Sequence, residues 1–326
     1  MTGPSQPSYP FTAAAAAHPA PPPGDVSRET GLLPPEAGVS RETEAAPPAP
    51  QPAAPPATSP WPAPGRTRVL TVANQKGGVG KTTTTVNLAA ALAQHGLRVL
   101  VVDLDPQGNA STAFDVHHGR GTASVYDVLL GKSRLDEIVR PVAAVPNLWC
   151  APATVDLAGA EVELAQMMAR EFRLVRALEA EAGGMDYVFI DCPPSLGLLT
   201  INALCAAAEV LIPVQCEFYA LEGLTQLRET IELVKTHLNS RLAISTILLT
   251  MYDGRTRLAD QVVADVRAHF GPLVLDAVIP RSVRVSEAPG FGQTVMTYDR
   301  ASAGARAYEA AAYDLAVRGG GQARLV

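Results

Sequence analysis

The chain has 326 residues, 18% of them charged, and a formal net charge of −6. This mildly acidic balance excludes nucleic-acid binding through overall charge, so any such contact needs a local cluster of arginines. No stretch reaches the ~20 apolar residues of a membrane span, and no basic segment leads into a long apolar one. We therefore expect a cytoplasmic protein that does not contact a membrane.

The first 65 residues differ in composition from the rest. Eighteen of the 28 prolines lie before Gly65, among Ala and Ser and with almost no periodic apolar residues. Such a segment buries too little apolar surface to offset its chain entropy. We predict a disordered Pro/Ala-rich arm over residues 1–65, one α/β domain over 66–320 and a flexible tail over 321–326.

From Arg68 onward, short β-branched segments alternate with longer amphipathic ones. The alternation predicts a doubly wound, mostly parallel sheet of about seven or eight strands with helices on both faces. Strands are expected at residues 69–73, 99–103, 148–151, 187–191, 210–214, 244–250 and 274–279. Helices are expected at residues 82–95, 157–182, 196–207, 220–238, 258–270 and 303–317. Ligands bind beyond the carboxyl ends of such strands, so the residues there are the candidates for chemistry.

A glycine-rich loop follows the first expected strand and leads directly into a helix. It runs Lys76-Gly77-Gly78-Val79-Gly80-Lys81-Thr82-Thr83. Glycines let backbone N–H groups surround phosphate oxygens, and the helix N-terminus adds its dipole. Lys81 is expected to reach the β- and γ-phosphates and the Thr82 hydroxyl to bind Mg²⁺. A turn that merely joins a strand to a helix would need neither this lysine nor this hydroxyl, so the loop predicts a nucleoside triphosphate site.

An additional lysine, Lys76, stands at the start of this loop, where other phosphate loops accept almost any residue. With Ala73-Asn74-Gln75 before it, the deviant loop resembles the ParA/Soj branch of the family that also contains MinD. The resemblance spans about residues 68–317. It implies an ATP hydrolase with weak intrinsic activity, assembled as a homodimer with ATP, in which Lys76 and Gly77 lie at the interface and Lys76 reaches the partner's phosphates.

Three carboxylates stand at the ends of expected strands. Asp103 and Asp105 follow the second strand, and Asp191 ends the strand at 187–191. By the resemblance, Asp105 orients the attacking water, Asp103 supports the Mg²⁺ shell and Asp191 holds Mg²⁺ through a water. For Asp103 and Asp105, ordinary capping of a strand end is the alternative. The resemblance also implies that the segment 106–109 is a switch that senses the γ-phosphate.

Glu217 and Tyr219 follow the strand expected at 210–214, in a segment that matches the family over its length. The resemblance makes both residues candidate contacts across the dimer interface. An amphipathic helix start with exposed carboxylates is the alternative for either residue alone.

Two arginine-bearing segments, 250–257 and 279–289, follow the last two expected strands and are expected to share one edge of the sheet. The first lacks the Asn-Lys-x-Asp pattern that reads guanine, which favours ATP over GTP. The resemblance implies that Arg255 and Arg284 bind DNA phosphates and that Pro280 and Arg281 border the nucleotide. Arg257, Arg267 and Arg281 are further DNA candidates, with a solvated basic face as the alternative. Ser282 stands where relatives carry Asn.

The resemblance implies an ATPase for chromosome or plasmid segregation. Its ATP dimer would bind nonspecific double-stranded DNA of the nucleoid, and a ParB-like centromere-binding partner would stimulate hydrolysis and release. The alternative is a MinD-like positioning ATPase on a membrane or polar partner, but residues 318–326 show no amphipathic anchor. A metal-cluster reductase would need interface cysteines, whereas the four cysteines lie in apolar segments typical of buried thiols.

The predicted arm contains Val-Ser-Arg-Glu-Thr twice, at residues 26–30 and 39–43. A low-complexity duplication or a docking motif is one interpretation. A second hypothesis concerns the gene, because the codons GTT TCA CGT GAA AC(N) encode this pentapeptide and form the palindrome GTTTCACGTGAAAC. That palindrome resembles the core of the centromere that ParB proteins recognise. Other synonymous codons in both copies would exclude the hypothesis.

Overall fold

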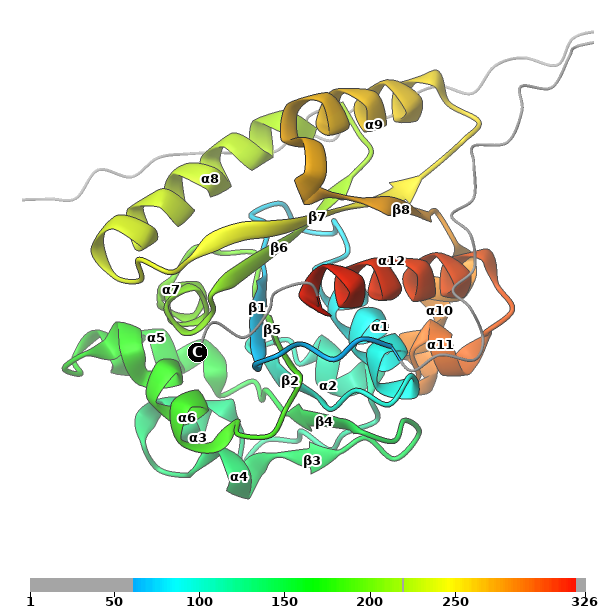
Figure 1. Cartoon of the computed structure of the whole chain (residues 1–326). Helices are drawn as coiled ribbons and strands as arrows, with labels where there is room; N and C mark the ends of the chain where they lie inside the picture. The colour runs from blue at the N-terminus through cyan, green and yellow to red at the C-terminus, as the bar shows by residue number, and fades with distance from the viewer. Residues whose placement is uncertain (1–60, 219, 321–326) are drawn as a thin grey trace, which may run out of the picture. The chain divides into compact units, whose positions relative to one another are not determined.

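The computed structural model describes residues 61–218 and 220–320, so the Val-Ser-Arg-Glu-Thr repeat, Tyr219 and the tail at 321–326 lie outside the described residues. Its centre is an eight-stranded sheet in the order β3-β4-β2-β5-β1-β6-β7-β8 (Figure 1). All pairs are parallel except β3 with β4. The predicted α/β fold is confirmed, with these strands: β1 Arg68–Val72, β2 Val99–Asp103, β3 Arg140–Pro141, β4 Leu148–Ala151, β5 Tyr187–Asp191, β6 Glu209–Gln215, β7 Ala243–Tyr252 and β8 Val274–Pro280.

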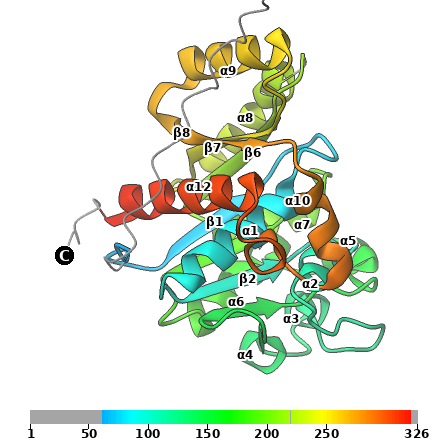
Figure 2. The same cartoon turned by 90° about the vertical axis from the view of Figure 1, so that its right-hand side faces the viewer.

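Helices cover both faces of the sheet because alternate strand residues are apolar on both sides. Leu70 and Val101 pack on the face covered by α1 and α12, which lie side by side in Figures 1 and 2. Leu100 and Ile190 face α3 to α7, while α8 and α9 cover β6 to β8 on that same side. The helices are α1 Lys81–Gln94, α2 Asn109–Ala113, α3 Val125–Leu130, α4 Leu135–Ile138, α5 Leu157–Ala165, α6 Arg173–Glu181, α7 Leu198–Ala206, α8 Ala220–His237, α9 Arg257–Phe270, α10 Val283–Glu287, α11 Val295–Tyr298 and α12 Ala303–Gly320.

Three 3₁₀ turns complete the elements: η1 Arg170–Phe172, η2 Gly271–Leu273 and η3 Ala288–Phe291. The first of them corrects one expectation from the sequence. The single helix expected over 157–182 is broken into α5, η1 and α6, because Ala169 adopts a left-handed conformation with φ 51°. Apolar periodicity continues through such a break, so the pattern alone does not reveal it.

The start of the folded part also differs from the expectation. Trp61 was assigned by composition to the arm, yet its side chain is only 5% exposed. Its ring stacks on His95 with centroids 3.8 Å apart and meets Tyr313 edge-on. The prolines around Trp61 conceal this packed side chain in the composition of the sequence, and the described residues begin at Trp61. Among the described helices, none has both the length and the apolar character to cross a bilayer.

Candidate nucleotide site and the adjoining arginines

The phosphate loop connects the end of β1 to the start of α1. Gly78 and Gly80 take φ angles of 74° and 90°, a region that side chains disfavour, so glycine is required at both positions. The carbonyl of Gly80 accepts the first bond of α1 from the N–H of Thr84. From β7, the buried hydroxyl of Thr250 donates to the carbonyl of Val79 at 2.9 Å. The sheet therefore holds the loop in shape from two strands.

The two lysines of the loop have different environments. Lys81 is 7% exposed at the start of α1, and its Nζ donates to the carbonyl of Lys76 at 3.3 Å. Burial lowers the pKa of Lys81, an effect that the negative charge of Asp191 opposes. The Lys76 ammonium instead reaches outward to Glu217 at 2.9 Å, with both side chains close to half exposed. Gln215 donates to the same carboxylate. The structure thus places Glu217, a predicted contact between subunits, against a lysine of its own chain.

The predicted metal ligands Asp103 and Asp191 come together because they are register partners at the ends of β2 and β5. Asp191 accepts hydrogen bonds from the hydroxyls of Thr82 at 2.7 Å and Thr85 at 3.0 Å. Asp103 accepts the N–H and hydroxyl of Ser111 at 2.8 and 2.7 Å. Burial raises the pKa of both carboxyls, and the charge of Asp103 raises that of Asp191 further.

This donor set fits a magnesium ion. Two carboxylates held in a buried position repel each other, and a divalent cation would restore their charged forms. Mg²⁺ prefers oxygen ligands and retains several waters, so the Thr82 hydroxyl and Asp191 suffice on the protein side. Asp103 is fixed by Ser111 and lies next to Asp191, a place suited to supporting the shell of waters.

Asp105 directly precedes the predicted switch segment at 106–109. Its side chain is 7% exposed and accepts the N–H of Gln107 at 3.0 Å. The segment turns at Gly108 into α2, whose Ser111 binds Asp103. One short helix therefore links the end of this segment to the carboxylate of Asp103.

Three residues of this site were not predicted from the sequence: Thr85, Ser111 and Thr250. Each is a buried hydroxyl that bonds to a loop carbonyl or a carboxylate. The available signal was polar residues at buried positions of otherwise apolar elements. That signal is weak, because Thr and Ser also occur in such places without a functional role.

The arginine segments meet at the edge that β7 and β8 share, as predicted. Pro280 ends β8, and the N–H of Arg281 donates to the carbonyl of Tyr252 at the end of β7. Arg255 and Arg284 are 86% and 56% exposed at their side chains. Arg267 does not join them, because it bonds to the carbonyl of Asp276, towards the amino end of β8. The four cysteines are buried and unpaired.

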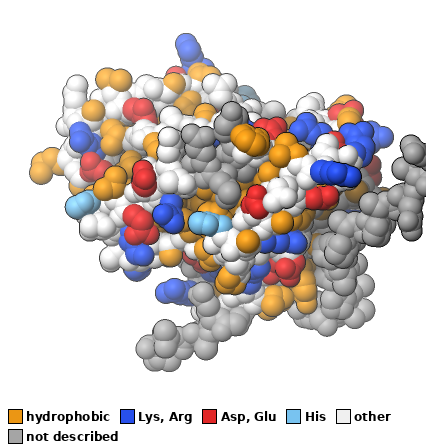
Figure 3. Space-filling view, turned by 90° about the horizontal axis from the view of Figure 1, so that it is seen from above, with side chains coloured by type: hydrophobic (Ala, Val, Ile, Leu, Met, Phe, Trp, Pro, Cys, Tyr) orange, Lys and Arg blue, Asp and Glu red, His pale blue; other side chains and the backbone are white. Residues whose placement is uncertain are grey.

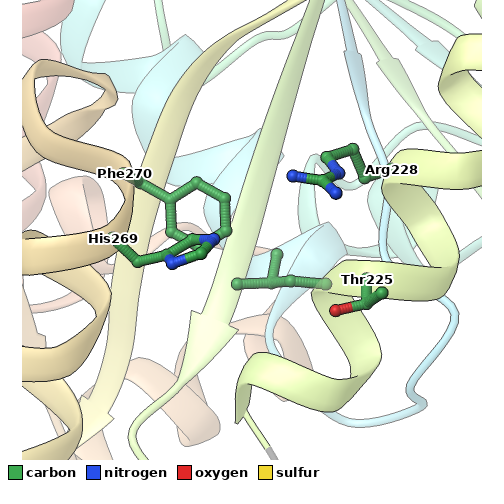
Figure 4. Close-up of a pocket in the computed structure, with 5 residues that line it drawn as sticks. Thr225, Arg228, His269 and Phe270 are labelled. Atoms are coloured by element: carbon green, nitrogen blue, oxygen red, sulfur yellow. The ribbon is translucent and has the colours of Figure 1, made fainter.

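Two hollows lie apart from the phosphate loop. One, of about 190 Å³, is bounded by Thr225 and Arg228 of α8 and by His269 and Phe270 of α9 (Figure 4). The other, of about 740 Å³, lies between the loop after α2 and the η3 turn, with His118 in its wall. The lining residues of neither hollow belong to the nucleotide site.

Comparison with known proteins places the chain in a family. A family model described as an AAA domain matches residues 67–244. The chromosome partitioning protein ParA of Caulobacter vibrioides is 55% identical over 244 residues, which cover 74% of this chain and 91% of that protein. The sporulation initiation inhibitor protein Soj of Bacillus subtilis is 52% identical over 252 residues, covering 77% and 99%.

Solved structures agree in fold and in the nature of the site. A Mycobacterium smegmatis protein named cobyrinic acid a,c-diamide synthase, solved with ADP and magnesium, has a TM-score of 0.66 and 42% identity and covers 76% of this chain and 93% of its own. The septum site-determining protein MinD of Pyrococcus horikoshii, solved with Mg-ADP, has a TM-score of 0.62 and 28% identity and covers 76% and 95%. The chain belongs to the ParA/Soj family of chromosome-partitioning ATPases.

Proposed function

We propose that this chain segregates replicated DNA as an ATP-bridged homodimer that binds DNA without regard to sequence and leaves it after hydrolysis. The observation that carries the proposal is the position of Lys76. Its side chain reaches out to Glu217 at a half-exposed place, whereas Lys81 is 7% exposed and bonds back to the carbonyl of Lys76. A second cation at the mouth of the site is suited to the phosphates of a facing nucleotide.

Each residue of the site has a definite task in this proposal. The loop N–H groups and Lys81 bind the phosphates, and Asp105 orients the attacking water. Thr82 and Asp191 would hold Mg²⁺, with Asp103 beside them, and the ion would supply positive charge against the phosphate oxygens. Pro280 and Arg281, at the end of β8, border the base. The Gln107 segment then responds to the γ-phosphate.

DNA binding is assigned to Arg255 and Arg284, with Arg257 and Arg281 beside them. All four follow the carboxyl ends of β7 and β8. Arginine suits phosphate contacts because its planar guanidinium binds two oxygens at once. Two contacts per chain become four in a dimer, and affinity falls with salt by a log–log slope of about −0.9 per phosphate. A dimer should then show a slope of about −3.6, against about −1.8 for one chain.

Release from DNA is assigned to a ParB-like partner that stimulates a slow basal hydrolysis. Until ATP is hydrolysed, the dimer would stay on the DNA of the nucleoid. A MinD-like positioning role and the synthase activity named for the M. smegmatis structure are the competing functions. Partition is preferred because the ParA and Soj relatives have 55% and 52% identity, against 42% for that structure and 28% for MinD.

Co-sedimentation with DNA of arbitrary sequence tests the proposal. With ATP and Mg²⁺ the wild type should be retained, and without nucleotide it should stay in the supernatant. Arg284→Ala should lose most retention, while ATP binding persists. Equal retention with and without ATP would contradict the proposal, and retention on anionic vesicles instead of DNA would favour the MinD-like alternative.

A further inference from the structure

The two arginines assigned to DNA already hold carboxylates of their own chain. Arg255 forms a two-pronged pair with Asp253, Nε to Oδ1 at 2.9 Å and Nη2 to Oδ2 at 2.7 Å. Arg284 donates from Nη1 to Glu287 at 3.2 Å, and its Nε lies 3.5 Å from Asp299. Such mixing is not confined to these pairs, since Lys and Arg side chains are interspersed with Asp and Glu on the face of the molecule that Figure 3 shows.

These pairs use the atoms that a phosphate would need. A guanidinium presents one fork whose Nε and Nη donors match two oxygens, and carboxylate and phosphate compete for it. By contrast, no carboxylate pairs with Arg257 in the described part of the chain. The competition therefore involves Arg255 and Arg284, although the charge of Arg281 also acts on Asp253.

The carboxylate of Asp253 is held in place by its loop. Its Oδ1 also accepts the backbone N–H of Arg255 at 3.1 Å, and its carbonyl accepts the N–H and hydroxyl of Thr256. The Arg255 side chain is 86% exposed, whereas that of Asp253 is 25% exposed and bonds to its own loop. The pairing with Arg255 lowers the pKa of Asp253 to about 2, so this carboxylate stays charged at any physiological pH. Its effect is constant and is not a pH switch.

We propose that the carboxylates of Asp253, which pairs with Arg255, and of Glu287 and Asp299, which pair with Arg284, set the affinity of this surface for DNA. They engage Arg255 and Arg284 internally, so that phosphate must displace them and a single chain binds too weakly to be retained. The inference rests on the proposed DNA-binding function. It adds a reason why two copies are needed, because only paired copies supply enough contacts to displace the carboxylates that hold the four arginines.

The size of the effect follows from the exposure of the pairs. An exposed ion pair shifts an equilibrium by about 1.5- to 5-fold. Release of one arginine in each chain of a dimer should therefore strengthen DNA binding by about 2- to 25-fold. A single chain, in which only one arginine is released, should bind DNA about 1.5- to 5-fold more tightly. DNA binding without nucleotide should therefore be easier to detect in this variant.

Asp253→Asn is the sharpest test because asparagine keeps an oxygen for the Arg255 N–H and removes only the charge. The matched control is Asp260→Asn in the neighbouring first turn of α9. Asp260 is exposed and accepts the Tyr252 hydroxyl, a bond that asparagine also keeps. Binding to a labelled duplex of arbitrary sequence is measured by fluorescence anisotropy, with ATP and without nucleotide, after melting curves verify that each variant is folded.

Asp253→Asn should bind DNA about 2- to 25-fold more tightly than the wild type with ATP, and Asp260→Asn clearly less so. In an Arg255→Ala background, Asp253→Asn should bring no gain, because no arginine remains to be released. Equal gains in DNA affinity from both asparagine variants, or a gain that persists without Arg255, would show that only the change in net charge matters. Either result would overturn the inference.

The outcomes also separate this inference from the function on which it rests. If both Arg255→Ala and Arg284→Ala leave DNA binding unchanged, the proposed DNA surface itself is wrong. If the alanine variants weaken binding and Asp253→Asn has no effect, the surface stands and only the role of the carboxylates is refuted. Glu287→Gln repeats the comparison at Arg284 with an expected gain of the same sign.

Discussion

Trp61 should anchor the start of the folded part, and two truncations that differ by five residues test this. One removes residues 1–60 and keeps Trp61; the other removes residues 1–65 and loses it. Replacing a buried aromatic side chain by alanine costs about 3–5 kcal/mol. The indole Nε1 of Trp61 is buried with no hydrogen-bond partner among the described atoms, a defect that lowers its net contribution. We therefore expect a loss of about 2–3 kcal/mol.

Urea denaturation of both truncations and of full-length Trp61→Ala measures this loss. For a domain of this size, about 2–4 °C in Tm accompanies each kcal/mol, so the melting temperature should fall by about 4–12 °C. The truncation that keeps Trp61 should match the full chain, because composition predicts no core before it. ATP turnover well below the melting temperature should not change, since Trp61 contacts His95, at the opposite end of α1 from the phosphate loop. Equal stability of the two truncations would refute the anchoring role.

Three further predictions concern single charges. Asp105→Ala should bind ATP normally and lower phosphate release by about 100-fold, since positioned groups that handle the reacting water contribute about 10²–10⁴; unchanged release would remove Asp105 from catalysis. Glu217→Gln removes the internal partner of Lys76 and should lower the ATP concentration for half-maximal dimerisation, measured by light scattering, by about 1.5- to 5-fold. If the variant needs more ATP than the wild type, Glu217 supports the dimer instead. Glu209→Gln leaves Arg68 buried without its partner at 2.6 Å and should cost about 3 kcal/mol at neutral pH. Burial opposes ionisation of Glu209, but the hydrogen bonds and charge of Arg68 outweigh burial and lower the pKa of Glu209. The stability difference between the wild type and Glu209→Gln should therefore be complete above the unfolded-state pKa of about 4.3 and vanish as the pH falls through the folded-state pKa. A stability difference that persists in acid would contradict the assignment.

The sheet was predictable because its central strands are buried on both faces and therefore appear as continuous apolar segments. Strands β2, β4 and β5 have the expected bounds, and the others differ by one or two residues at their ends. The two-residue strand β3 was missed, because its residues Arg140 and Pro141 are exposed and too few to form a pattern. The short helices α2, α3, α4, α10 and α11 were missed for the same reason, since four to six residues span less than two turns.

The candidate site was predictable where a residue type is required by the chemistry. Gly78 and Lys81 follow β1 within a few residues, and Asp191 is the last residue of β5. Because β1 and β5 are parallel neighbours, their carboxyl ends bring these residues together. The internal pairs were not predictable. The contact between Lys76 and Glu217 joins residues 141 positions apart, and the pair of Arg255 with Asp253 depends on the turn after β7. Sequence spacing does not specify side-chain partners of this kind.

Lys76 is proposed to complete the nucleotide site of a second copy. The mass of the protein in sedimentation equilibrium with ATP and Mg²⁺ measures this, with Asp105→Ala used to slow hydrolysis. We expect a dimer for Asp105→Ala, and a monomer that still binds ATP when Lys76→Ala is added. If the double variant remained dimeric, Lys76 would not hold the two copies together.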